Sequence, residues 1–196
     1  MAELSAVLKK AQIEIEADFY NEQSRKLFFS TNIPYLKIII CRSFDIATLV
    51  SYGAADLGVC GLDVIAEFQY DNLTVMSDLK IGRCKFSVAS KKDFDLDAAD
   101  NLVVATKYPN LTKSFFDRIN KKIETIKLNG SIELAVNLNL CDVITDLVSS
   151  GKTLKDNNLE EKKLIIEVTS QLIINNNSMA TNNEQILAII DRFTDE

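Results

Sequence analysis

The sequence predicts an α/β protein, because short apolar segments alternate along the chain with segments of helical periodicity. The alternation is clearest in three apolar or β-branched segments, at 102–106, 123–128 and 143–147, each followed by a helical pattern. Such alternation builds βαβ units, in which helices cover parallel strands. We therefore expect mainly parallel sheets.

The same patterns predict the remaining elements. Leu4, Val7 and Leu8 fall on one face of an amphipathic helix at the start of the chain. Further strands are expected at 35–41, 55–59, 73–76, 83–89, 164–168 and 172–174. Further helices are expected at 46–50, 62–68 and 184–193, with polar loops at 91–100 and 175–178.

Composition limits the class of protein. The chain has 196 residues, of which 47% are hydrophobic and 26% charged, as in soluble globular proteins. No apolar run approaches the ~20 residues of a membrane-spanning helix. The first residues show no signal peptide, so we expect a cytoplasmic protein. A net charge of −6 argues against nucleic acid as the main partner.

Cysteine and histidine usage restricts the chemistry. The four cysteines are far apart, without metal-binding spacing, and are expected to be small buried hydrophobes. The chain has no histidine, which excludes Ser-His-Asp and Cys-His mechanisms and most catalytic zinc sites. Any catalysis must therefore use carboxylates, cations, backbone donors or a bound metal ion.

The segment 143–154 carries the strongest functional signal. A strand runs into the small-residue turn 149–151, and a helix start is expected at Thr153. Hydroxyls and backbone N–H groups that converge at a helix start can hold a phosphate. Asp146, just upstream, suits ribose hydroxyls or a phosphate-bound metal ion. The segment predicts a phosphoribosyl site; the alternative is an ordinary strand–turn–helix corner.

Four blocks in this order, 53–61, 105–111, 127–135 and 143–154, resemble ATP phosphoribosyltransferase, the first enzyme of histidine biosynthesis. The resemblance runs from about Leu4 to Asn175. The length resembles the short form of the family, which lacks a C-terminal regulatory domain. Short forms work in a hetero-oligomer with a regulatory subunit that resembles a histidyl-tRNA synthetase catalytic domain.

The resemblance implies two domains of the type II periplasmic-binding-protein fold. Domain I would comprise 1–89 and 169–196, and domain II 90–168. The family's usual first strand, ending in Lys-Gly-Arg, is missing, because Met1 stands where the following helix begins. Either the start lies upstream or part of the site is lacking. Asn139 and Cys141 also replace a glycine and a small residue of the family pattern.

The family transfers the 5-phosphoribosyl group of 5-phosphoribosyl 1-pyrophosphate (PRPP) to N1 of ATP and releases pyrophosphate. Mg²⁺ would assist, and no covalent nucleophile is required. Asp146 and Glu133 are the implied catalytic residues; the metal ligands stay unassigned. The implied PRPP-binding residues are Asp146, Ser149, Ser150, Gly151, Lys152 and Thr153. The implied ATP-binding residues are Arg42, Gly58, Gly61, Arg83, Thr106 and Lys107.

Simpler interpretations remain open at three of these positions. The alternative for Lys152 is an exposed turn lysine. The alternative for Glu133 is a first-turn glutamate favoured by the helix dipole, and that for Arg83 is an exposed strand arginine. An alternative function for the whole chain is a non-catalytic small-molecule-binding or regulatory module of the same fold.

Overall fold

The computed structural model describes residues 2–21, 23–181 and 183–194. The chain forms two compact units. The first unit comprises 1–64, 70–82 and 169–196, and the second comprises 65–69 and 83–168. The division into domains at residues 89 and 168 stays a prediction. Among the described residues, no helix is long and apolar enough to cross a membrane.

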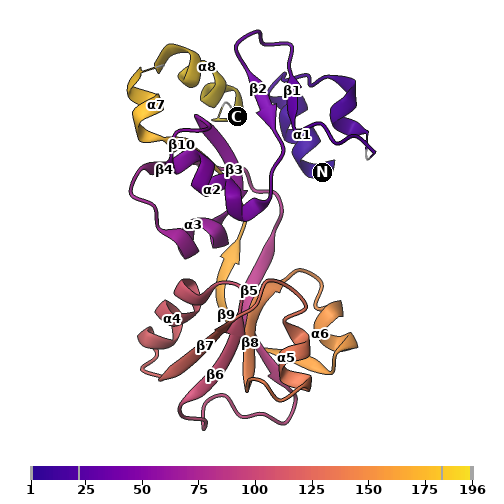
Figure 1. Ribbon diagram of the computed structural model, residues 1–196, viewed down its shortest axis with the longest axis vertical. Helices are drawn as coiled ribbons and strands as arrows, with labels where there is room; N and C mark the ends of the chain where they lie inside the picture. Colours follow the sequence, from indigo (N-terminus) through magenta and orange to yellow (C-terminus); the bar gives the residue numbers. More distant parts are fainter. Residues whose placement is uncertain (1, 22, 182, 195–196) are drawn as a thin grey trace. The chain divides into compact units, whose positions relative to one another are not determined.

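The first unit is built on a three-stranded antiparallel sheet (Figure 1). Its order is β3 (Leu57–Gly61), β10 (Ser170–Asn175), β4 (Leu73–Asp78), so the last strand in the chain lies in the middle. A separate hairpin pairs β1 (Phe28–Ser30) with β2 (Lys37–Ile39). The other elements are α1 (Ala2–Lys10), η1 (Ala17–Tyr20), α2 (Ser43–Ser51), α3 (Leu62–Phe68), α7 (Asn176–Thr181) and α8 (Asn183–Thr194), with α3 ending in the second unit.

Helices α8 and α2 pack on the three-stranded sheet of this first unit, with Ile186 and Ile190 of α8 against Leu172 and Ile174 of β10. Leu8 of α1 and Ile189 of α8 share one apolar cluster, against which Ile38 of β2 packs. On α2, the methyl groups of Ile46 and Val50 would lie 2.8 Å from a Cβ at Gly58. Because such a contact is too close, Gly58 lets α2 pack directly on β3.

The second unit contains a five-stranded sheet in the order β7-β6-β8-β5-β9. The parallel pairs are β6 with β7 and β6 with β8, whereas β5 runs antiparallel to both of its neighbours. The strands are β5 (Cys84–Lys91), β6 (Leu102–Thr106), β7 (Ile123–Lys127), β8 (Val143–Val148) and β9 (Leu159–Val168). The helices are α4 (Pro109–Arg118), α5 (Glu133–Asn137) and α6 (Lys152–Asp156).

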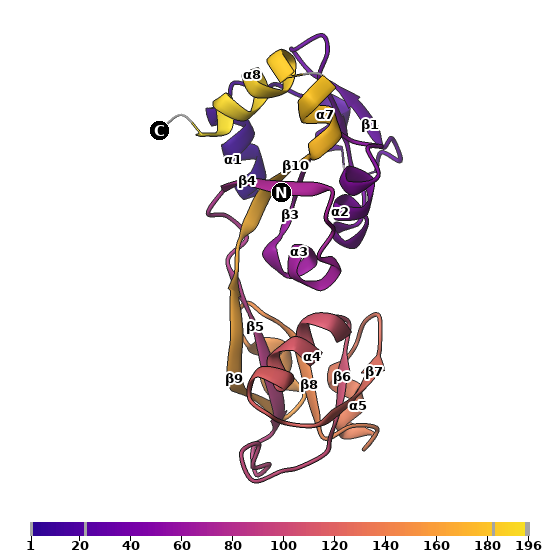
Figure 2. The same ribbon diagram turned by 90° about the vertical axis from the view of Figure 1, so that its left-hand side faces the viewer.

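Helices cover both faces of the five-stranded sheet, on opposite sides in Figure 1. On one face, Phe115 and Phe116 of α4 pack with alternate strand residues such as Val143. On the other face, Val136 of α5 and Leu154 of α6 pack in another cluster with the intervening strand residues. The second unit is therefore a three-layer α/β structure; Figure 2 shows its sheet from the side of α4.

The prediction of mainly parallel sheets is wrong. Of the strand pairs formed by described residues, only β6–β7 and β6–β8 are parallel. The βαβ rule applies to strands joined by a crossover helix within one sheet. The chain enters β5 from the first unit and returns to it after β9. The rule therefore does not determine the direction of these two strands. The coarser prediction of an α/β protein is confirmed.

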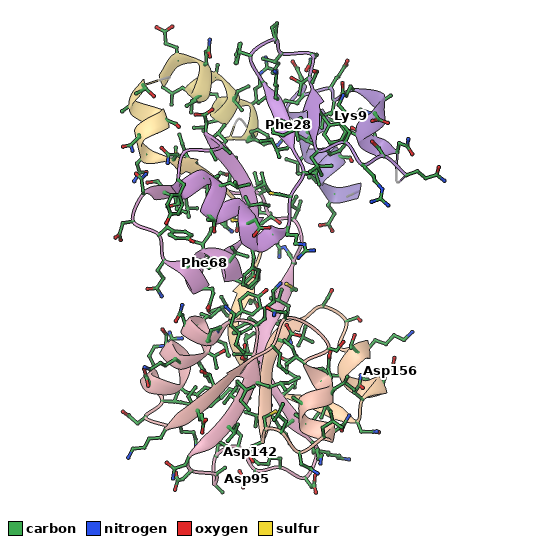
Figure 3. The ribbon with its side chains drawn as sticks, in the orientation of Figure 1. Lys9, Phe28, Phe68, Asp95, Asp142 and Asp156 are labelled. Carbon is green, nitrogen blue, oxygen red and sulfur yellow. The ribbon has the colours of Figure 1, made fainter. Side chains whose placement is uncertain are left out.

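Two of the expected segments differ from the structure locally. The expected buried strand at 35–41 is reduced to the three residues of β2, two of them exposed, in a hairpin whose outer face carries the exposed Phe28 (Figure 3). The expected loop at 175–178 instead opens α7, because the buried Asn175 side chain accepts hydrogen bonds from the N–H groups of Asn177 and Ser178. That side chain caps the helix.

Candidate active site

Three parallel strands end at one edge of the second unit's sheet. Thr106 of β6 pairs with Lys127 at the end of β7 and with Thr145 of β8. The segments after these strands, 107–108, 128–132 and 149–151, therefore gather at this carboxyl edge. Asp142, which precedes β8, lies at the opposite edge (Figure 3).

The strand order marks the carboxyl edge between β6 and β8 as a candidate binding position. From β6 the chain passes through α4 to β7, and from β7 through α5, on the other face, to β8. From β8 the chain enters α6, which packs on the same face as α5, so the connections after the adjacent strands β6 and β8 diverge to opposite faces. Ligands of α/β sheets bind where the chain diverges in this way.

The loop after β8 makes a tight turn into α6. Gly151 has φ +70° and forms the N-cap of α6, a conformation that favours glycine. Its carbonyl accepts from the N–H of Lys155 at 3.2 Å, and Ser150 Oγ accepts from the N–H of Lys152 at 3.4 Å. Four of the predicted phosphate ligands have exposed side chains: Ser149, Ser150, Lys152 and Thr153.

The two predicted catalytic carboxylates lie on different elements at this edge. Asp146 is half-buried in β8, and its Oδ1 accepts from the N–H of Leu147 at 2.8 Å. Glu133 is half-buried at the first position of α5. The sheet thus brings Asp146, Glu133 and the segment 149–153, called the phosphate loop below, to one edge.

Buried hydroxyls tie the strands together beneath this edge. Thr112 of α4 lies 2.6 Å, oxygen to oxygen, from the hydroxyl of Thr145, and it donates to Thr106 Oγ1 at 3.3 Å. Thr106 Oγ1 donates to the carbonyl of Thr145 at 3.0 Å and accepts from the N–H of Tyr108. All three threonines are fully buried. The network fixes the residues that precede Lys107 and Asp146.

Glu67 is a further buried carboxylate, which the sequence did not reveal. Its oxygens accept from the N–H groups of Asn110 at 3.3 Å and Leu111 at 2.9 Å, so it caps the N-terminus of α4. Burial raises the pKa of Glu67 above its ordinary value, although these two bonds and the charge of Lys127 oppose the shift. No local sequence signal pairs a glutamate with a helix more than 40 residues away.

Comparisons with known proteins now decide the family. The pattern of the family described as "HisG: ATP phosphoribosyltransferase" matches residues 42–195. An ATP phosphoribosyltransferase of Novosphingobium aromaticivorans is 44% identical over 191 residues, covering 95% of this chain and 86% of that protein. An ATP phosphoribosyltransferase of Gluconobacter oxydans is 45% identical over 193 residues, covering 97% of this chain and 80% of that protein.

The chain belongs to the ATP phosphoribosyltransferase family. A solved structure agrees with this assignment: the ATP phosphoribosyl transferase (HisG:HisZ) complex from Thermotoga maritima. Its matching chain superposes with a TM-score of 0.81 at 26% sequence identity, covering 98% of this chain and 90% of that chain. The fold and the four sequence blocks thus lead to the same family.

The residues predicted for ATP are divided between the two units of this phosphoribosyltransferase. In the first unit, Arg42 is exposed at the N-cap of α2 and Gly61 ends β3. In the second unit, Arg83 is exposed before β5 and Lys107 is partly buried after β6. The roles of all four stay predictions.

Two members of the predicted ATP set have structural roles. The Thr106 hydroxyl is buried and engaged in the threonine network, so it is not exposed to a ligand. Gly58 is required by the packing of α2. Neither feature needs a bound nucleotide to explain the residue type.

The cysteines are unbridged, and those with raised pKa values are poor nucleophiles. Cys60 and Cys141 are buried, whereas Cys41 and Cys84 are partly exposed. Burial raises the pKa of Cys60 to about 12, with a smaller contribution from Asp63. Burial also raises the pKa of Cys141. Thiolates are the reactive form, so these environments suit packing rather than catalysis.

Proposed function

We propose that this chain transfers the 5-phosphoribosyl group of PRPP to N1 of ATP and releases pyrophosphate, the first step of histidine biosynthesis. The observation that carries the proposal is the Gly151 turn, with its exposed hydroxyls, at the same sheet edge as Asp146. Family membership supports the reaction. We also propose that the two units represent the domains of a type II periplasmic-binding-protein fold.

The phosphate loop binds the 5-phosphate of PRPP in this proposal. N–H groups and hydroxyls between Ser149 and Thr153 donate to the phosphate oxygens, and Gly151 provides the turn that lets the backbone approach. Asp146, near the end of the strand that leads into this loop, accepts from the ribose hydroxyls. Glu133 supplies a second negative charge near the ribosyl carbon, which becomes positively charged as pyrophosphate leaves.

The residues at this edge are suited to an Mg²⁺ ion that arrives bound to the substrate phosphates, because they offer few ligands of their own. The described residues contain no group of three or more acidic, cysteine or histidine side chains placed to hold a metal. Mg²⁺ is commonly held by one or two carboxylates together with substrate phosphates, and Asp146 is the available carboxylate beside the phosphate loop. When bound, the ion would stabilise the negative charge of the departing pyrophosphate.

Positioning supplies most of the catalysis in this proposal, because no covalent nucleophile is needed. Lys107 is partly buried and directly follows β6, the parallel neighbour of the strand that contains Asp146. We propose that it contacts the polyphosphate of a substrate. Arg42 and Arg83 are proposed as further phosphate ligands on the ATP side.

We further propose that the chain works with a regulatory subunit in a hetero-oligomer. The support is the similarity to the Thermotoga maritima chain, whose structure is titled as a HisG:HisZ complex. The expected partner resembles a histidyl-tRNA synthetase catalytic domain.

The test is an assay of the full-length protein with ATP, PRPP and Mg²⁺, in the presence and absence of the co-purified regulatory subunit. We expect formation of phosphoribosyl-ATP and pyrophosphate. Absence of both products when substrates, metal and subunit are all present would overturn the proposal, and binding of PRPP without turnover would favour a binding module.

A further inference from the structure

Ser87 is a buried polar residue that the mechanism above does not use. It lies in β5 with 0% of its surface exposed. Its Oγ is shielded from solvent and makes no hydrogen bond to any described residue. A buried hydroxyl without a hydrogen-bond partner lowers the stability of the folded state, whereas an alanine at the same position would not carry this cost. The unmet donor therefore needs an explanation.

The register of the sheet places Ser87 beside the proposed ribose carboxylate. Ser87 pairs directly with Asp146 across the antiparallel strands β5 and β8. Opposite residues in such a pair point to the same face, with Cβ atoms roughly 4.5–5.5 Å apart. That face carries α5 and α6, because the next pair along the strands, Ala89 with Ile144, belongs to their cluster.

We propose that Ser87 is a positioning residue of the phosphoribosyl site, whose hydroxyl donates to the Asp146 carboxylate when substrate is bound. In this structure Asp146 Oδ1 accepts from its neighbouring N–H, on Leu147. When the carboxylate turns to accept ribose hydroxyls, it comes within reach of the serine opposite. The Ser87 hydroxyl is then satisfied only in the complex, so it stabilises the bound state selectively.

This inference rests on the proposed function, and a matched pair of variants tests it. Ser90 is also fully buried in β5, but its hydroxyl donates to the carbonyl of Lys91 at 3.2 Å. We expect Ser87→Ala to melt no lower than wild type, yet to bind PRPP about tenfold more weakly. Ser90→Ala should do the reverse, with a lower Tm and unchanged PRPP affinity.

Calorimetric titration with PRPP and with ATP, together with thermal melts, gives the measurement. Wild-type PRPP affinity in Ser87→Ala would overturn the inference, as would equal losses for both substrates. Ser87→Cys, close in size but a weak donor, should reproduce the PRPP loss and covers the case in which the alanine variant fails to fold.

A double-mutant cycle shows whether Ser87 acts through Asp146. In an Asp146→Asn background, Ser87→Ala should weaken PRPP binding by less than twofold, whereas independent, additive losses would contradict the inference. Failure of the wild type to bind PRPP would refute the proposed function itself. Wild-type binding that Ser87→Ala leaves intact would refute only the role of Ser87.

Discussion

The two units use sheets of different direction, and the difference determines where binding residues can gather. In the first unit, β10 runs antiparallel to both neighbours, so successive loops leave from opposite edges. In the second unit, β6, β7 and β8 are parallel, so their following loops meet at one edge. The predicted PRPP ligands come from β8 and the loop after it, and Glu133 joins them from the connection after β7, whereas the ATP candidates of the first unit come from the start of α2 (Arg42) and from β3 (Gly58 and Gly61).

If this comparison is correct, the largest effect on a substrate should come from the phosphate loop. Thr153→Ala removes a hydroxyl proposed to donate to a phosphate, a charge-assisted bond worth about 1.5–3 kcal/mol. We expect PRPP affinity to fall by that amount and ATP affinity to change little, as measured by calorimetric titration. Thr153→Ser keeps the hydroxyl and should retain most of the affinity; equal losses for both substrates would mean that the loop is misassigned.

In the first unit, the substitution Gly58→Ala should change the stability of the fold rather than substrate affinity. Gly58→Ala would place a methyl 2.8 Å from side-chain methyls of Ile46 and Val50. Overpacking of this kind costs about 1–3 kcal/mol, which chemical denaturation would detect. We expect substrate affinities measured well below the melting temperature to stay near wild type. A stable Gly58→Ala protein that has lost ATP binding would instead support a ligand contact at this glycine.

A pair of glycines at the carboxyl edge sharpens the comparison within the second unit. Gly151 has φ +70°, where an alanine costs about 1–2 kcal/mol, whereas a Cβ at Gly130 meets nothing within 4 Å. Gly151→Ala should weaken PRPP binding several-fold as the turn relaxes, and Gly130→Ala should leave it unchanged. Identical PRPP affinities for the two variants would show that the turn geometry is not used in binding.

The smallest expected effect concerns Glu67, which caps α4 of the second unit. Glu67→Ala leaves two N–H groups without their acceptor and should cost about 0.5–2 kcal/mol of stability. Because burial raises the pKa of Glu67, the folded state holds its proton more tightly than the unfolded state. Its contribution to stability is therefore fully present below the ordinary glutamate pKa and declines as pH rises through the higher, folded-state value.

Glu67→Gln provides the control for that pH dependence, because glutamine keeps an acceptor oxygen but does not titrate. The stability of wild type relative to Glu67→Gln should decrease as pH increases from 4 to 7, in urea titrations at matched ionic strength. An increase over the same range would contradict the direction of the pKa shift.

The sequence predicts what depends on local pattern. The buried strand β6 is found at the expected residues 102–106, and the strand before the phosphate loop extends one residue further than expected. Strand direction in β5 and β9 was not predictable, because it depends on the passage of the chain between units. Ser87 looks like an ordinary small residue in an apolar strand; only the register opposite Asp146 distinguishes it.

The candidate site divides in the same way. Local sequence predicts the turn, and the structure has it at Gly151 with φ +70°, whereas the binding of phosphate there stays a prediction. The resemblance implies that Thr106 binds ATP, but it cannot show that tertiary packing brings Thr112 and Thr145 to the Thr106 hydroxyl. The cap that Glu67 provides to α4 likewise depends on a long-range contact.

The position of β10 in the middle of the first unit's sheet has a consequence for synthesis. The ribosome makes β3 and β4 early, but the strand that hydrogen-bonds to both is made only after residue 169. All five strands of the second unit's sheet have been translated by then. The N-terminal part of a chain usually folds first, and here that order is reversed. The nascent chain can complete the five-stranded sheet of the second unit while the three-stranded sheet of the first unit still lacks its central strand.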